Sequence, residues 1–237
     1  MKKNVIPVIM YFGTMGVGKG TQTKMTAERY DYTIIESGAI CRQIKTERPQ
    51  EGTARYALQQ RVITGMSNKL VNNADMIQMI KDELAQLNLE KCTGVIFDGF
   101  PRTVLQALAL EDALITQGKI LSTDKVKVVF KIIACLEQWL GADREVAERI
   151  ALERVSNRAK ETEMGGGTIR DDDKPEKAAV KIKQYFDEIV HVANFYLGKG
   201  VHYLTDARHD SYTVFRLNCQ NIESGLLKNG IKIPKLD

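Results

Sequence analysis

Five apolar runs punctuate the chain, and each has the length and composition of a buried strand. They are rich in β-branched and aromatic side chains and lack a strict apolar–polar alternation, which favours strands covered on both faces. The runs lie at residues 5–12, 32–35, 94–97, 126–133 and 201–204. The run at 126–133 is the most hydrophobic stretch of the chain. We therefore expect five strands in one buried sheet.

Helices are predicted between these runs, where apolar positions recur at helical spacing. The expected segments are residues 21–29, 37–48, 54–63, 73–87, 104–115, 144–158, 175–198 and a terminal helix from about residue 212. The expected helix ends are Pro49, Gly65, Gly118 and Gly198, and the expected caps of the fourth helix are Asn72 and Asn73. Two apolar stripes should face the core: Met76, Ile77, Ile80, Leu84 and Leu87, and then Ala179, Ile182, Phe186, Ile189, Ala193 and Tyr196.

Strands that alternate with helices predict an α/β fold, a five-stranded parallel sheet with helices on both faces. Ligands bind to such sheets beyond the carboxyl ends of the strands. Polar or glycine-rich segments follow four of the expected strands, at residues 13–21, 37–42, 98–102 and 205–208. We expect these four segments to converge on one rim of the sheet.

Residues 13–21 form a glycine-rich loop that ends in a lysine, between an expected strand and an expected helix. Glycines let consecutive backbone N–H groups turn toward an anion, and the helix N-terminus adds its positive dipole end. Lys19 supplies a charge for terminal phosphates. Gly20 follows this lysine where many such loops have a hydroxyl residue, and the hydroxyl comes one place later at Thr21. The alternative is an ordinary turn, but the flanking elements favour a phosphate-binding loop.

Composition points to a small anionic ligand rather than to nucleic acid or a membrane. The net charge is only +4 and no block of lysine or arginine exists, so a nucleic-acid partner is not favoured. No run approaches membrane-spanning length. Met1 and the two lysines after it faintly imitate a signal peptide, but the apolar run that follows leads directly into the glycine loop and is interpreted as a strand.

The four cysteines favour free thiols in a reducing cytoplasm. Cys41, Cys92, Cys135 and Cys219 lie far apart, and none forms a Cys-x-x-Cys pair for zinc or redox chemistry. Four cysteines could pair in two disulfides, but a binding site for a phosphorylated metabolite favours a cytoplasmic location.

The segment Asp98-Gly-Phe-Pro-Arg102 at a strand end allows two interpretations. As structure, the glycine and proline make a turn that the aspartate caps. As function, Asp98 helps to hold a hydrated magnesium ion and Arg102 reaches a second phosphate. Arg154 and Arg158 fall on one face of an expected helix, and Arg170 begins a run of charged residues; each of these arginines is either solvated or functional. The loop at residues 161–168 contains three adjacent glycines, which suit a mobile flap.

Two segments resemble those of the adenylate kinases, members of the nucleoside monophosphate kinase family. They are the end of the glycine loop, Gly-Lys-Gly-Thr-Gln, and the segment Asp-Gly-Phe-Pro-Arg-Thr. The resemblance runs from Val5 to about His209 with gaps in three places. It implies a P-loop NTPase fold with a helical NMP-binding insertion and a short lid without zinc. It also implies reversible, Mg²⁺-dependent transfer of the ATP γ-phosphoryl group to AMP, giving two ADP. The expected partners are ATP and AMP, and the expected state is a monomer.

The resemblance also assigns roles to residues. It implies that the catalytic residues are Lys19, Arg102, Arg158, Arg170, Lys181 and Asp98. It implies that the ATP-binding residues are Gly16, Val17, Gly18, Lys19, Gly20, Thr21, Arg154, Arg158 and His209. It implies that the AMP-binding residues are Ser37, Gly38, Arg42, Lys69, Leu70, Val71, Gly99, Phe100, Pro101, Arg102, Gln106, Arg170 and Lys181. It places the magnesium ion on Thr21 and, through water, on Asp98. The attacking phosphate oxygen is already ionised, so the mechanism needs no catalytic base and relies on positioning, charge neutralisation and exclusion of water.

The domain division that follows is one P-loop kinase unit over residues 1–237. Its core comprises residues 1–35, 74–157 and 174–237, its NMP-binding insertion residues 36–73, and its lid residues 158–173. The six residues from Cys135 to Leu140 contain the one tryptophan, Trp139, which is interpreted as packing or as an insertion.

Several departures from the family pattern keep alternatives open. Met15 stands where proline is usual, Ala39 replaces an aspartate, and Lys181 replaces an arginine, which loses the bidentate guanidinium. Residues 65–68 lengthen the approach to Lys69. The alternatives are a kinase for another monophosphate such as UMP or CMP, and a nucleotide-binding module with weakened catalysis. Gln106 favours adenine because its amide offers a donor and an acceptor together.

Overall fold

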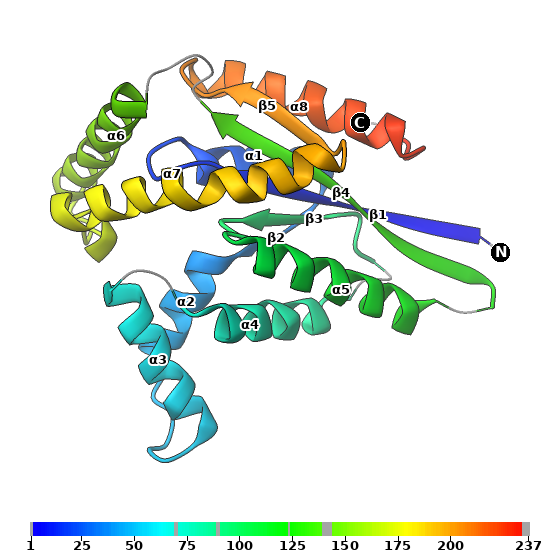
Figure 1. Ribbon diagram of the computed structural model, residues 1–237, viewed down its shortest axis with the longest axis horizontal. Coiled ribbons are helices and arrows are strands. Elements are labelled where there is room, and N and C mark those ends of the chain that lie inside the picture. Colours follow the sequence, from blue (N-terminus) through cyan, green and yellow to red (C-terminus); the bar gives the residue numbers. More distant parts are fainter. Residues whose placement is uncertain (1, 69–70, 89–90, 123, 139–143, 234–237) are drawn as a thin grey trace.

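The computed structural model describes residues 2–68, 71–88, 91–122, 124–138 and 144–233. Five strands form one parallel sheet, as the sequence predicts, and the structure gives their order as β2-β3-β1-β4-β5 (Figure 1). The strands are β1 (Lys2–Phe12), β2 (Thr33–Glu36), β3 (Val95–Asp98), β4 (Val126–Gln138) and β5 (His202–Asp206). β1 is therefore the central strand of the sheet.

The strand registers bring the carboxyl ends of the strands to one edge. Tyr11 in β1 is opposite Asp98 in β3, and Glu36 at the end of β2 is also opposite Asp98. On the other side of β1, Gln138 in β4 is opposite Asp206 in β5. Each segment that follows one of these ends starts at the same rim of the sheet.

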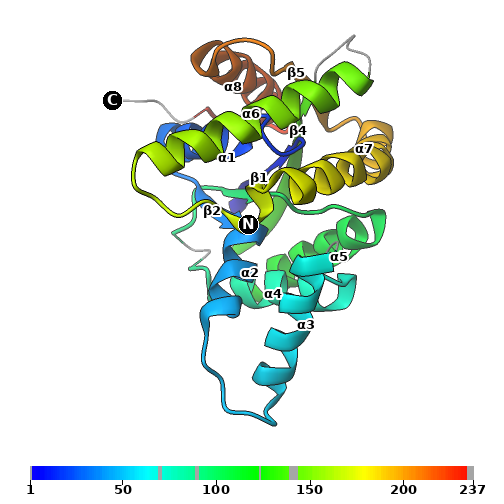
Figure 2. The ribbon, with the colours of Figure 1, turned by 90° about the vertical axis from the view of Figure 1, so that its left-hand side faces the viewer.

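Eight α-helices and one short 3-10 helix lie within the described residues. They are α1 (Lys19–Tyr30), α2 (Ser37–Thr46), α3 (Ala54–Asn68), α4 (Asn73–Gln86), α5 (Val104–Leu121), α6 (Arg144–Met164), η1 (Asp171–Asp173), α7 (Pro175–Gly198) and α8 (Ser211–Lys228). In Figure 2, α6 lies across the upper part of the molecule, and α2 and α3 extend on the opposite side of the rim.

The core has a layer on each face of the sheet. One layer joins β1 and β3 to α4, α5 and α7, with Val8, Phe97 and Leu110 among its buried members. The other layer joins β1 to α1 and α8, and includes Tyr11 and Ile222. The alternating side chains of β1 supply both layers, so burial on both faces explains the continuous apolar run in its sequence.

Two helices continue through glycines that were expected to end them. α3 passes Gly65 and ends at Asn68, because the next residue, Met66, packs against the core and outweighs the roughly 1 kcal/mol helix penalty of glycine. α5 passes Gly118 and ends at Leu121. A Cβ at Gly118 would lie 3.1 Å from the carbonyl oxygen of Val128, so this glycine allows close packing on β4.

Two other boundaries also differ from the expectation. α6 extends to Met164, so the loop expected at 161–168 is helical over its first four residues. Glu161, Glu163 and Met164 are good helix formers, and the hydroxyl of Thr162 donates to the Arg158 carbonyl at 2.8 Å. β4 extends to Gln138 rather than ending near Ile133, because β5 pairs with its last five residues.

The stripe expected on α7 is shifted by one residue at its start. Ala178 is buried and packs with α6, whereas Ala179 is exposed. Ile182, Ala193 and Tyr196 are buried as expected. Trp139 lies outside the described residues. Among the helices that are described, none is both long enough and apolar enough to cross a lipid bilayer.

Candidate active site

The glycine loop connects β1 to α1 in a conformation that requires glycine at two positions. Gly16 and Gly18 have φ angles of 77° and 104°, in the left-handed region. A Cβ at Gly16 would lie only 2.7 Å from the carbonyl oxygen of Ala151 in α6. Val17, between the two glycines, is buried against α6 and α7. The loop is therefore packed firmly beneath α6, with the N-terminus of α1 at its open side.

Lys19 begins α1 and turns its side chain back over the loop. Its Nζ donates to the carbonyl oxygens of Gly13 at 2.7 Å and Thr14 at 2.9 Å. Gly20 and Thr21 follow, and both line the cavity beyond the loop. Because no Cβ would meet an atom within 4 Å at Gly20, the glycine here is not required by packing.

Asp98 ends β3 and presents a buried carboxyl group to the same cavity. Burial raises the pKa of this carboxyl above its usual value, and the nearby positive charge of Lys19 opposes that rise. The hydroxyl of Thr23, in α1, lies 3.5 Å from Asp98 Oδ2. The carboxyl group of Asp98, whose oxygen atoms could bind a cation, is thus held close to the lysine of the glycine loop.

The turn after β3 ties two predicted phosphate-binding segments together. The Ser37 hydroxyl, at the start of α2, donates to the Gly99 carbonyl at 3.0 Å. Arg102 Nε donates to the same oxygen at 2.8 Å. Gly99 has a φ angle of 72°, and the Phe100–Pro101 peptide is cis. Ser37 and Arg102 are therefore neighbours.

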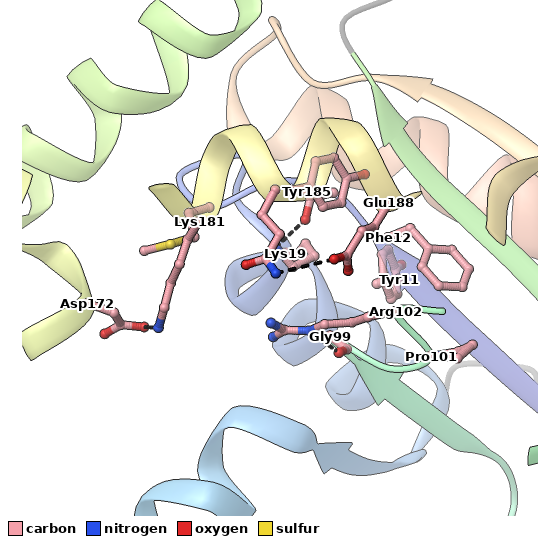
Figure 3. A pocket seen from close by; sticks show the side chains of 13 residues that line it. Tyr11, Phe12, Lys19, Gly99, Pro101, Arg102, Asp172, Lys181, Tyr185 and Glu188 are labelled. Atoms are coloured by element: carbon pink, nitrogen blue, oxygen red, sulfur yellow. Dashed lines mark hydrogen bonds and ion pairs between the residues drawn. The ribbon is translucent and has the colours of Figure 1, made fainter. Parts of the chain in front are cut away.

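One cavity brings together positive side chains from three elements (Figure 3). Lys19 comes from α1, Arg102 from the segment after β3, and Lys181 from α7. Lys181 Nζ lies 3.4 Å from a carboxylate oxygen of Asp172. The Glu188 carboxylate also lines the cavity and is turned toward Lys19 in Figure 3. Gathered cations of this kind can bind and neutralise polyphosphate groups.

An adjoining cavity opens between α2, α4 and the start of α5. It shares Gly99, Arg102, Asp172 and Lys181 with the first one. Its other lining residues are Ser37, Gly38, Cys41, Arg42, Met66, Val71, Met76 and Gln106. Arg42 is paired with Glu36 at 2.5 Å. The wall is partly apolar and partly cationic, which suits a molecule with a flat base and a phosphate.

Two of the arginines predicted to act near the lid have partners within the protein. Arg158, on α6, makes two hydrogen bonds with the buried Asp173 carboxylate, at 3.0 and 2.5 Å. Arg154, one turn earlier, donates twice to the Ala207 carbonyl at 3.1 Å. Arg158 and Arg170 line the cavity beside the glycine loop. These residues therefore surround the side of the rim on which the glycine loop lies.

Some predicted site residues are not brought into these cavities. His209 is exposed, 4.0 Å from the Asp206 carboxylate, and does not line them. Phe100 is buried in the core against Phe97, with ring centroids 6.1 Å apart. Lys69 and Leu70 lie outside the described residues.

Sequence reasoning missed several cavity residues: Glu36, Cys41, Met66, Met76 and Glu188. Two of them left a signal in the sequence. Glu188 follows Lys181 by seven residues on a predicted helix, a spacing that places both on one face. Glu36 directly follows a predicted strand, the position at which ligand-binding residues gather.

Comparisons with known proteins agree on one family. The family model described as adenylate kinase matches residues 11–201. A protein of Rhizobium meliloti (strain 1021) named adenylate kinase is 28% identical over 206 residues, covering 87% of this chain and 94% of that protein. An adenylate kinase of Lachnoclostridium phytofermentans is 29% identical, with the same coverage. One of Bartonella tribocorum is 30% identical over 193 residues, covering 81% of this chain and 88% of that protein.

Proposed function

Since the chain belongs to the adenylate kinase family of nucleoside monophosphate phosphotransferases, we propose that it transfers the γ-phosphoryl group of ATP to AMP and back. The observation that carries this proposal is the gathering of Lys19, Arg102 and Lys181 in one cavity. Each comes from a different element, and together they provide the positive charge that a phosphoryl group needs between two anionic nucleotides.

ATP would bind on the side of the glycine loop. There, backbone N–H groups at the start of α1 and the Lys19 ammonium are close to the cavity that Arg158 and Arg170 also line. The proposed ATP-binding residues are Gly16, Val17, Gly18, Lys19, Gly20, Thr21, Arg154, Arg158 and His209. The exposed position of His209 makes it the least supported member of this set.

AMP would bind in the adjoining cavity, with its phosphate toward Arg42 and Arg102 and its base toward the start of α5. The apolar side chains of Val71 and Met76 offer a surface for a flat base. The proposed AMP-binding residues are Ser37, Gly38, Arg42, Lys69, Leu70, Val71, Gly99, Phe100, Pro101, Arg102, Gln106, Arg170 and Lys181. Gln106 supports adenine because its amide can donate and accept side by side.

Substrate phosphates would replace oxygen atoms of the protein as the hydrogen-bond partners of the cationic side chains. Lys19 now donates to two loop carbonyls, Arg42 pairs with Glu36, and Arg158 pairs with Asp173. A phosphate can take over each of these interactions as a charged acceptor. The chain's own residues thus bind the nucleotides, align the reacting oxygens, and exclude water when the lid closes.

We propose that Thr21 and Asp98 hold the magnesium ion, Thr21 by its hydroxyl and Asp98 through bound water. Both residues offer oxygen atoms, which Mg²⁺ prefers, and both line the cavity beside the glycine loop. The raised pKa of the buried Asp98 carboxyl fits this role, because a cation beside it would favour its ionised form. When bound, the ion supplies positive charge to the polyphosphate.

The same proposal includes the division into a core, an NMP-binding insertion at 36–73 and a lid at 158–173. The insertion contains α2 and α3, and the proposed lid contains the end of α6, the following loop and η1. A monomer in the cytoplasm is also part of the proposal, supported by a reaction that needs one active site and cytoplasmic nucleotides.

A panel of monophosphates tests the proposal. The purified protein is incubated with ATP, Mg²⁺ and one of AMP, UMP, CMP, GMP or IMP, and ADP formation is measured. We expect ATP turnover that depends on AMP and is much weaker with the others. A preference for UMP or CMP would identify that nucleotide, rather than AMP, as the acceptor. ATP turnover that does not depend on any monophosphate would reject the kinase assignment of this site.

A further inference from the structure

The side chain of Gln106 is held at both ends of its amide. It is only 3% exposed and lies in the first turn of α5. Its Oε1 accepts from the backbone N–H of Arg102 at 2.8 Å, and its Nε2 donates to Oδ1 of Asn73 at 2.9 Å. Asn73 begins α4, 33 residues earlier in the chain. Two separate elements therefore determine how this amide is placed.

The chemistry of these partners determines the direction of the amide. A backbone N–H can only donate, so the Gln106 atom that faces Arg102 is the oxygen, and the NH₂ end faces Asn73. Oδ1 of Asn73 accepts there, and it lies 3.3 Å from the hydroxyl of Thr103, which donates to it. The Thr103 hydroxyl in turn accepts from the backbone N–H of Gln106 at 3.2 Å. The network is consistent with only this orientation of Gln106.

Gln106 lines the cavity proposed for AMP, and the protein uses only half of the hydrogen-bonding capacity of its amide. A glutamine amide has two acceptor positions and two N–H donors, and the protein uses one of each. One acceptor and one donor remain on Gln106, which lines the cavity with Val71 and Met76. The 6-amino group and N1 of adenine are a donor beside an acceptor, the complement of this pair. The 6-oxo group and N1–H of hypoxanthine present the opposite order.

We propose that Asn73 is a specificity-determining residue, which holds the Gln106 amide in the direction that accepts a 6-aminopurine monophosphate and rejects its 6-oxo analogue. Asn73 does not line the cavity and acts through Gln106, so it is a positioning residue. The inference rests on the proposed function, because it explains how the acceptor of that reaction is chosen.

The surroundings of Asn73 are suited to this role. The preceding residue, Asn72, caps α4 by accepting from the Asp75 N–H at 2.9 Å. Asp75 makes two hydrogen bonds, each of 2.8 Å, with Arg61 in α3. The first turn of α4 is thereby fixed independently of the contact with Gln106. Substitutions of Asn72 and Asn73 can therefore separate helix capping from amide positioning.

The experiment compares kcat and KM for AMP and IMP, with ATP as donor, in the wild type and in Asn73→Ala, Asn73→Ser and Asn73→Asp. Alanine removes the acceptor that Nε2 needs, and the shorter side chain of serine moves its hydroxyl oxygen away from Nε2, whereas aspartate keeps an oxygen at the same place. We expect the ratio of kcat/KM for AMP to that for IMP to fall about tenfold in Asn73→Ala and Asn73→Ser. The change should lie in KM for AMP, with KM for ATP unaltered. Asn73→Asp should retain the wild-type preference.

Asn72→Ala is the matched control, since it weakens the same helix turn without touching Gln106. It should lower the melting temperature and leave the AMP-to-IMP ratio unchanged. Equilibrium binding of AMP and IMP, measured calorimetrically, gives a readout that is independent of turnover. An unchanged ratio in both Asn73→Ala and Asn73→Ser, or an equal fall in Asn72→Ala, would overturn the role of Asn73 while leaving AMP kinase activity intact. A wild type that uses no AMP would instead reject the proposed function itself.

Discussion

At the scale of single residues, the cationic side chains of the site are already satisfied by the protein. Lys19 donates to carbonyl oxygens, and Arg42 and Arg158 pair with carboxylates. Binding a nucleotide therefore exchanges one set of hydrogen bonds for another, so the net gain per bond is smaller than the roughly 4–6 kcal/mol of an isolated hydrogen bond. Because the exchange itself gains little, the geometry of several such groups must provide the selectivity for phosphate.

Removing either of two cationic side chains should greatly reduce catalysis. For Lys19→Ala and Arg102→Ala we expect kcat to fall by about 100- to 1,000-fold or more, because each removes positive charge from the position of the transferred group. Both side chains are at the cavity surface and not in the core, so the melting temperature should change little. Steady-state kinetics and thermal melts provide the measurements.

Arg149→Ala is the control for that pair, since Arg149 is exposed on α6 and bonds only to Glu153 in the described structure. Its kcat should equal that of the wild type. Near-normal turnover in Lys19→Ala or in Arg102→Ala would contradict the role assigned to the residue concerned.

Individual site residues are predictable where a local motif contains them and not where partners are distant in sequence. Lys19 and Asp98 belong to short motifs, so the amino-acid sequence alone predicts that they meet at one rim of the sheet, and both line the cavity beside the glycine loop. The contact between Asn73 and Gln106 joins residues 33 apart, and only the packing of α4 beside α5 creates it. The sequence therefore predicts Gln106 as a base-reading residue without the residue that orients it.

At the scale of elements, the join between the glycine loop and α6 should tolerate no side chain at Gly16. In Gly16→Ala, a left-handed backbone costs about 1–2 kcal/mol, and the clash with the Ala151 carbonyl adds about 1–3 kcal/mol of overpacking. We expect a free energy of unfolding at least about 2 kcal/mol lower, measured by urea denaturation, together with a reduced affinity for ATP.

Gly198→Ala serves as the comparison for that substitution. Gly198 ends α7, its φ angle is not positive, and an added Cβ would meet no atom within 4 Å. Its stability should stay within about 1 kcal/mol of the wild type. Equal losses in both variants would show that the contact between Gly16 and Ala151 does not matter.

The types of the elements are predictable from the sequence, but several of their ends are not. Continuous apolar runs identify the five strands and helical periodicity identifies the eight α-helices of the described residues, because burial on two faces or on one leaves a distinct pattern. The ends of α3 and α5 depend on what lies beside Gly65 and Gly118. From the sequence alone, a glycine that allows close packing inside a helix cannot be distinguished from a glycine that ends one. The extra residues of β4 depend on its pairing with β5, which no local pattern reveals.

At the scale of the whole molecule, simultaneous occupation of both cavities should stabilise the protein and reduce its motion. A two-headed analogue that links two adenosines through phosphates can reach both the cavity beside the glycine loop and the cavity proposed for AMP. These two cavities share the residues Ser37, Gly38, Arg42, Gly99, Arg102 and Asp172. At 100 times its Kd the analogue should add about 2.7 kcal/mol to the free energy of unfolding. Hydrogen exchange should slow in residues 47–53 and 165–170, the loops after α2 and α6.

α8 lies on the other face of the sheet and provides the internal reference for that measurement. Its exchange should change only as far as global stability changes. If hydrogen exchange slowed near the glycine loop and stayed unchanged in residues 47–53, the analogue would occupy only the ATP side.

The overall architecture is the most predictable level, because alternating strands and helices leave few topologies. The strand order is not predictable beyond a single parallel sheet. It depends on which strands become neighbours, and β1 has partners from residues 95–98 and 126–136.

The central position of β1 has a consequence for synthesis on the ribosome. Residues 2–12 are translated before both strands that flank them, by about 80 residues for β3 and about 110 residues for β4. An unpaired, strongly apolar segment is thus exposed on the nascent chain until those strands have been made. Closing such distant contacts also slows folding, so chaperones that shelter apolar extended segments should engage this protein at its amino-terminal end.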